Sequence, residues 1–205
     1  MDGFEAWTAY LFARPLKDQA WEEQPDEWLD GHARQDTPVA AAERVRHLFG
    51  NAGELLRPYA DDHVARGLTE IIEGGPLHAL SSKQVPTVLR TTTLRSIVTL
   101  FAEVFAPRIQ VEQLRRPSDL EHVCFMFFDI APVELGDDTV LDVLEAVLAL
   151  DSVPCRRAAL HGLGHAHLTS PEHAGPIVER WLRTHRDAPQ ELREYAAAAR
   201  VGQVM

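Results

Sequence analysis

The sequence predicts an all-α protein built of helical hairpins, and three observations support this fold class. Strand signals are scarce, because the chain has no alternating runs of Val, Ile and Thr, and neither of its Asp-Gly pairs, at 2–3 and 30–31, lies between such runs as a hairpin turn would. Helix caps and starts recur along the chain, with apolar residues at helical spacing between them. The last two predicted hairpins also repeat one another in their apolar positions. The helices therefore form either a stacked solenoid or an irregular bundle.

The N-terminal part begins with a predicted helix around 4–12, followed by another that carries Trp21 and Trp28. Thr37 and Pro38 then begin a helix that runs to about residue 49, since Thr is a favoured cap and Pro suits the first helical position. A further helix begins at the acidic pair 61–62 and ends at the glycine pair 74–75. We interpret the segment 74–86 as a loop.

Two apolar helices are predicted in the middle of the chain. Pro86 begins a long helix that we expect Pro107 to stop. Ser118 and Glu121 form a capping box before the run 123–128. Because this second helix is apolar on nearly all sides, we expect it at the centre of the core. The predicted core residues are Phe125, Met126, Phe128, Leu144, Val147, Leu160, Leu163 and Trp181.

Four more helices are predicted in the C-terminal part, beginning at the acidic pair 137–138, at Ser152, at Ser170 and at 188–189. The helix that begins at Ser152 is expected to end near Gly164.

An internal repeat relates these last four helices. Val143, Leu144, Val147 and Leu148 map onto Ile177, Val178, Trp181 and Leu182 at a shift of 34, and the following helices map at a shift of 35. This pattern, with the segment 159–164 as the inner helix of a hairpin, resembles HEAT and armadillo-type helical repeats over Asp137 to Met205. The resemblance implies a right-handed solenoid, which the upstream helices would have to extend. We expect a single all-α domain over 1–205, with an N-terminal helical part (1–75) and a repeat-like part (86–205).

Composition and charge restrict the classes of partner. The 205 residues are 45% hydrophobic and 25% charged, as in ordinary globular proteins, and the net charge is −11. This charge disfavours nucleic acid and anionic membrane surfaces, whereas a basic protein partner would be attracted. Nearly all of the basic residues are arginines, which we interpret as the codon bias of a G+C-rich bacterial genome.

Cysteine usage and apolar run lengths favour a cytoplasmic protein. The two cysteines, Cys124 and Cys155, lie in apolar contexts and do not form a disulfide framework. The longest apolar run, 123–128, is far shorter than a membrane span. The start of the chain is acidic where a signal peptide would be basic.

The sharpest candidate for chemistry is a histidine cluster. His161 and His165 are one helical turn apart and could hold one metal ion, zinc in particular, with His173 as a third ligand. Gly162 stands where a metalloprotease motif would place its glutamate. The alternative interpretation is structural: the glycines between the histidines let two helices pack closely, and the histidines lie at the edge of the contact.

Asp129 ends the apolar helix and therefore needs a partner, for which Arg90 and Arg95 are candidates.

A second candidate site is a group of arginines near the C-terminus. Ion pairs with Glu179, Glu191 and Glu194 would explain these arginines as well as an anionic ligand would. The candidate binding residues are Arg183, Arg186, Arg193 and Arg200.

No nucleophile motif or phosphate-binding loop is present in the sequence. The sequence therefore favours a non-catalytic helical-repeat module that binds another protein, for example a bacterial neutralising or adaptor protein, without a cofactor. The alternative is a metal-binding protein or metal-dependent enzyme that uses the His161 and His165 pair with zinc.

Overall fold

The computed structural model describes residues 2–14, 37–73, 75–109 and 117–204. Every regular element in these ranges is helical, so the predicted all-α class is confirmed. The predicted helix that carries Trp21 and Trp28 lies outside the described residues.

Most of the described helices lie within a few residues of their predicted positions. In chain order they are α1 (Asp2–Ala13), α3 (Pro38–Gly50), α4 (Ala52–Leu55), α5 (Asp61–Glu73), the 3-10 helix η1 (Pro76–Ser81), α6 (Thr87–Leu100), the π-helix η2 (Phe101–Phe105), α7 (Ala106–Arg108), α8 (Asp119–Ile130), α9 (Asp138–Leu148), α10 (Val153–His167), α11 (Pro171–Thr184) and α12 (Gln190–Ala199).

Side-chain caps begin several of these helices where the sequence predicted them. The Thr37 hydroxyl accepts a hydrogen bond from the backbone N–H of Ala40 at 3.2 Å. Ser118 and Glu121 form the predicted capping box, with bonds of 3.2 and 3.4 Å between each side chain and the other's backbone N–H. Each cap satisfies N–H groups that have no partner inside the helix, which is why short-range sequence signals locate these starts.

The helical segment that begins after Pro86 continues through the π-helical turn η2 and ends with α7 at Arg108, within two residues of its predicted end. Two local expectations were wrong. α10 continues past Gly164 to His167. The segment 74–86, which was interpreted as a loop, contains η1.

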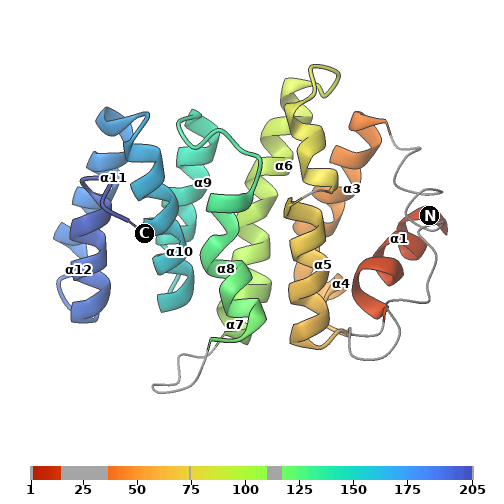
Figure 1. Ribbon diagram of the computed structural model, residues 1–205, viewed down its shortest axis with the longest axis horizontal. Coiled ribbons are helices and arrows are strands. Elements are labelled where there is room, and N and C mark those ends of the chain that lie inside the picture. The colour runs from red at the N-terminus through yellow and green to blue at the C-terminus, as the bar shows by residue number, and fades with distance from the viewer. Residues whose placement is uncertain (1, 15–36, 74, 110–116, 205) are drawn as a thin grey trace.

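The helices lie side by side in a row from α1 at one end to α11 and α12 at the other (Figure 1). Within the row, α3, α6, α9 and α11 contact one another in that order. α5, α8, α10 and α12 form a second series of successive contacts, which α1 extends through α5. Alternate helices of the chain therefore belong to one of two neighbouring series.

Buried apolar residues form one continuous cluster from Trp7 to Ala199. Six of the eight predicted core residues are buried, but Phe125 and Met126 are half-buried. In α8 the fully buried rings are Phe127 and Phe128, which pack against Phe101 of η2. The expected central position of α8 therefore holds for its Phe127 and Phe128 side, whereas its Phe125 side is half-buried beside His161 of α10 and Tyr195 of α12.

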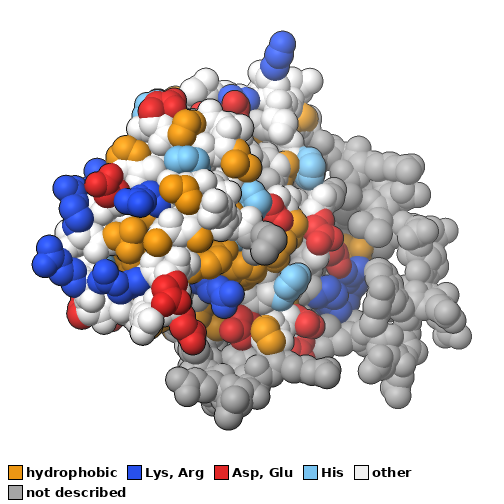
Figure 2. Space-filling model, turned by 60° about the vertical axis from the view of Figure 1, so that its left-hand side comes forward, with side chains coloured by type: hydrophobic (Ala, Val, Ile, Leu, Met, Phe, Trp, Pro, Cys, Tyr) orange, Lys and Arg blue, Asp and Glu red, His pale blue; other side chains and the backbone are white. Residues whose placement is uncertain are grey.

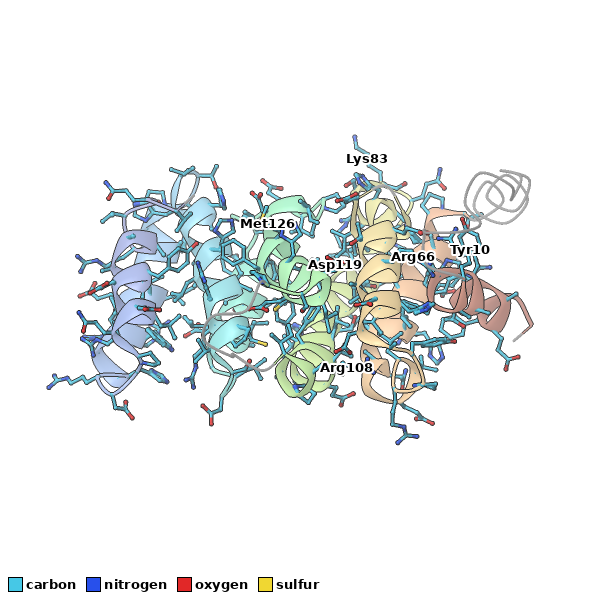
Figure 3. The ribbon with its side chains drawn as sticks, turned by 60° about the horizontal axis from the view of Figure 1, so that its bottom comes forward. Tyr10, Arg66, Lys83, Arg108, Asp119 and Met126 are labelled. Carbon is cyan, nitrogen blue, oxygen red and sulfur yellow. The ribbon has the colours of Figure 1, made fainter. Side chains whose placement is uncertain are left out.

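Arg108, at the end of the α6–α7 segment, forms hydrogen bonds with the connection between α4 and α5 (Figure 3). Its guanidinium donates to the carbonyl oxygens of Leu56 at 2.7 Å and Tyr59 at 2.9 Å and pairs with Asp61 at 3.1 Å. No helix within the described ranges has both the length and the apolar character needed to cross a membrane.

Candidate functional site

Helix α10 carries the two histidines of the predicted metal pair, and Gly162 determines how closely this helix approaches its neighbours. A Cβ atom at Gly162 would lie 2.7 Å from Cδ2 of Leu144 on α9 and 2.9 Å from Cβ of Phe128 on α8. The missing side chain therefore lets the three helices pack closely, as the structural interpretation of this segment expected. The close contact also brings the C-terminal end of α8, and Asp129 with it, to the histidine face of α10.

Three ligand-type side chains meet at this contact. The Nε2 atoms of His161 and His165 are 3.2 Å apart, and Nε2 of His165 lies 3.3 Å from Oδ1 of Asp129. One donor atom from each of the three residues falls within 4.8 Å of the other two. We refer to Asp129, His161 and His165 as the histidine–aspartate cluster.

The other ring nitrogen of His161 is held by the next helix pair. Its Nδ1 atom lies 2.7 Å from the hydroxyl oxygen of Tyr195 on α12. The Phe125 ring packs against His161 with centroids 4.5 Å apart, and the Arg157 guanidinium lies over the rings of Phe125 and Tyr195. The ring orientation of His161 is therefore constrained from α8, α10 and α12 together.

Burial and charge favour the neutral imidazole at His161. Burial is the largest cause that lowers the pKa of His161, and the neighbouring His165 and Arg157 lower this pKa further. The Asp129 carboxylate acts in the opposite direction and raises this pKa. Neutral imidazole is the form that accepts a hydrogen bond or binds a metal ion through its bare nitrogen.

The structure places the other candidate residues differently from the expectation. Asp129 pairs with His165, whereas Arg90 donates to backbone carbonyls and Arg95 lies 3.9 Å from Asp142. His173 is exposed, contacts Ser170 and Glu172, and is not part of the cluster. The third ligand-type residue is therefore Asp129. Asp129 could have been identified as an acid at the end of an apolar helix, if that helix was expected to pack against the helix that carries the histidines.

The four candidate arginines surround one surface cavity of about 500 Å³ at the α11–α12 end of the molecule. Figure 2 shows basic side chains gathered over this end, and since the chain has lysines only at 17 and 83, these side chains are arginines. We call this feature the arginine cavity. Its lining residues are Glu179, Leu182, Arg183, Arg186, Arg193 and Arg200.

The described residues contain no ion pair between these arginines and a carboxylate. Glu194 instead accepts a hydrogen bond from Gln190 at 2.8 Å, and Arg193 donates to the backbone carbonyl of His185 at 3.3 Å. The interpretation that ion pairs with Glu179, Glu191 and Glu194 account for the arginines thus has no support in the described part of the chain. Four guanidinium groups around one cavity can bind carboxylate or phosphate groups, because each guanidinium donates several hydrogen bonds to their oxygens.

Comparison of the chain with protein-family models, with curated proteins and with solved structures found no match.

Proposed function

We propose that this chain is a non-catalytic helical-repeat module that binds an acidic segment of a partner protein through the arginine cavity. The observation that carries the proposal is the convergence of four arginines without carboxylate partners on one cavity, within the described residues. A bidentate guanidinium matches the geometry of a carboxylate, so several of them can recognise closely spaced Asp and Glu side chains.

A HEAT-like solenoid is the architecture we propose for the module. The two series of helix contacts support it, because stacked hairpins place their first helices in one row and their second helices in the other. The internal register supports it as well. Val143 and Leu144 of α9 correspond to Ile177 and Val178 of α11, and all four side chains are buried.

The arginine cavity lies on the last hairpin of this stack. A terminal repeat needs a polar outer face for solubility, and arginines supply one. Four arginines and one acid give this face a local positive charge inside a chain whose net charge is −11. Since charges are screened over roughly 8 Å at physiological salt, an approaching partner responds to the local sign. This end therefore favours an acidic partner, in place of the basic partner that net charge alone would attract.

Binding of a fluorescein-labelled peptide rich in Asp and Glu, measured by anisotropy, tests this proposal. Arg186→Glu should weaken binding of the peptide at least about tenfold, as expected for loss of a charge-assisted contact and gain of repulsion. Lys83→Glu is the matched control, because it changes the net charge equally and Lys83 points into solvent away from α11 and α12 (Figure 3).

Three outcomes would overturn the proposal. The wild-type protein could fail to bind the peptide, or the two charge reversals could weaken binding equally. Free glutamate could also compete as strongly, per carboxylate, as the peptide does, which would indicate a small-anion site instead of a protein-binding site.

A further inference from the structure

We infer that Asp129, His161 and His165 form a zinc-binding site with an open fourth position. The inference is independent of the arginine cavity, because the two sites share no residue. Two imidazole nitrogens and one carboxylate oxygen are ligand types that zinc prefers, and three protein ligands leave one coordination position for water or for a partner's side chain.

The spacing of the donor atoms fits a tetrahedral ion. Zinc binds nitrogen and oxygen ligands at about 2.0–2.2 Å, which places adjacent tetrahedral ligands about 3.3–3.6 Å apart. Nε2 of His165 lies 3.2 Å from Nε2 of His161 and 3.3 Å from Oδ1 of Asp129. All three donor atoms lie within 4.8 Å of one another, so a shift of the exposed Asp129 carboxylate toward His161 would bring the histidine–aspartate cluster around one ion.

Tyr195 prepares His161 for this role. If Nδ1–H of His161 donates to the Tyr195 hydroxyl at 2.7 Å, the Nε2 lone pair of His161 faces the cluster. In the metal-free protein, Nε2–H of His165 can donate to both Nε2 of His161 and Oδ1 of Asp129. Zinc would take the place of this proton, with His165 then carrying its proton on Nδ1.

Charge and access are also compatible with a bound cation. Asp129 supplies one negative charge, which opposes the positive charge of the nearby Arg157. The side chains of Asp129 and His165 are 35% and 29% exposed, so an ion can enter from solvent without unfolding of the core. His161, in contrast, is 2% exposed and anchors the inner side of the site.

Cobalt(II) titration of the purified full chain tests the inference, because tetrahedral cobalt gives intense visible absorption bands and occupies zinc sites. We expect one equivalent of cobalt to give these bands and one equivalent of zinc to abolish them. Zinc affinity is then measured by competition with a chromophoric chelator.

The variants separate the cluster from other surface groups. Asp129→Asn and His165→Gln should each weaken zinc binding more than about 100-fold, and Tyr195→Phe about tenfold, as for loss of a ligand and of a ligand's hydrogen-bond partner. His173→Gln is the matched control, because it removes an exposed histidine outside the cluster. Circular dichroism verifies that each variant folds. Because Asp129 is exposed, we expect Asp129→Asn to fold, and this variant tests the inference even if a histidine variant fails to fold.

The inference is overturned if the wild type gives no tetrahedral cobalt spectrum, since the cluster would then be a hydrogen-bonded chain alone. It is also overturned if His173→Gln weakens zinc binding as much as His165→Gln does, or if Asp129→Asn leaves the affinity unchanged. Arg186→Glu should leave zinc binding unchanged whether or not the peptide experiment succeeds.

Discussion

The Nδ1 atom of His161 lies 2.7 Å from the hydroxyl oxygen of Tyr195 and so joins α10 to α12 through one buried imidazole. The two ring planes are inclined by 12°, with centroids 6.5 Å apart. This hydrogen bond gives the buried ring nitrogen a partner that it would otherwise lack. The last helix is thereby tied to the helix that carries the histidine–aspartate cluster.

Replacement of Tyr195 by Phe should lower the free energy of unfolding by about 1 kcal/mol, because the ring remains and the partner of His161 Nδ1 is lost. Chemical denaturation with and without the substitution measures this loss. Tyr59→Phe is the matched control, since the described residues show no hydrogen bond to the Tyr59 hydroxyl. An equal loss in both variants would mean that the His161 contact contributes nothing specific.

Truncation of two neighbouring rings in α8 should have different costs. Phe128 is 1% exposed and packs on Phe101, so Phe128→Ala should lower the free energy of unfolding by about 3 to 5 kcal/mol. Phe125 is half-buried at the surface beside His161, so Phe125→Ala should lower it by less than about 2 kcal/mol. Urea denaturation compares the two variants, and a loss below about 1 kcal/mol for Phe128→Ala would contradict its central position.

The same two rings show which features of the fold can be predicted from the sequence alone. Helix starts such as those at Ser118 and Thr37 could be predicted because a cap and its partner are three residues apart. The side of α8 that faces solvent could not, because the run 123–128 is apolar on nearly all sides and has no pattern to distinguish Phe125 from Phe127. Packing against Phe101, far away in sequence, makes that distinction.

The candidate site was predictable only where it is local in sequence. His161 and His165 are neighbours on one helix, and the sequence identifies them as a pair. Asp129 joins them across the contact between α8 and α10, and its position depends on which helices pack together and on the close approach at Gly162. His173 is nearer in sequence, but it follows the turn into α11 and is not part of the cluster.

The charge pair between Arg14, which directly follows α1, and Glu70 of α5 should give stability a specific pH dependence. Glu70 pairs with Arg14, but burial is the largest influence and raises the pKa of Glu70 above its ordinary value of 4.5, against the opposing charges of Arg14 and Arg66. A group with a raised pKa in the folded state contributes stability below its unfolded pKa and loses that contribution as pH rises through its folded pKa. Glu70→Gln, which does not titrate, should therefore gain stability relative to the wild type as pH rises from about 4.5 toward 7.

Urea denaturation of both proteins at several pH values measures this relative change. Glu5→Gln is the control, because Glu5 is an exposed acid on α1. A difference between Glu70→Gln and wild type that stays constant with pH, or falls as pH rises, would show that the Arg14 and Arg66 charges outweigh burial.

Gly162→Ala should destabilise the protein even though alanine favours the helix. Helix propensity alone would stabilise the variant by about 1 kcal/mol, but the new Cβ would lie 2.7 Å from Leu144 and 2.9 Å from Phe128. Overpacking of this kind costs about 1 to 3 kcal/mol, and Cβ of Phe128 is too close to its backbone to move cheaply. Gly50→Ala, at the exposed end of α3 with no atom within 4 Å of the added Cβ, should instead be neutral or stabilising. Thermal and urea denaturation measure the stability of both variants. A gain of stability in Gly162→Ala as well as in Gly50→Ala would contradict the prediction, because it would mean that the contact of α10 with α8 and α9 accommodates the added methyl group.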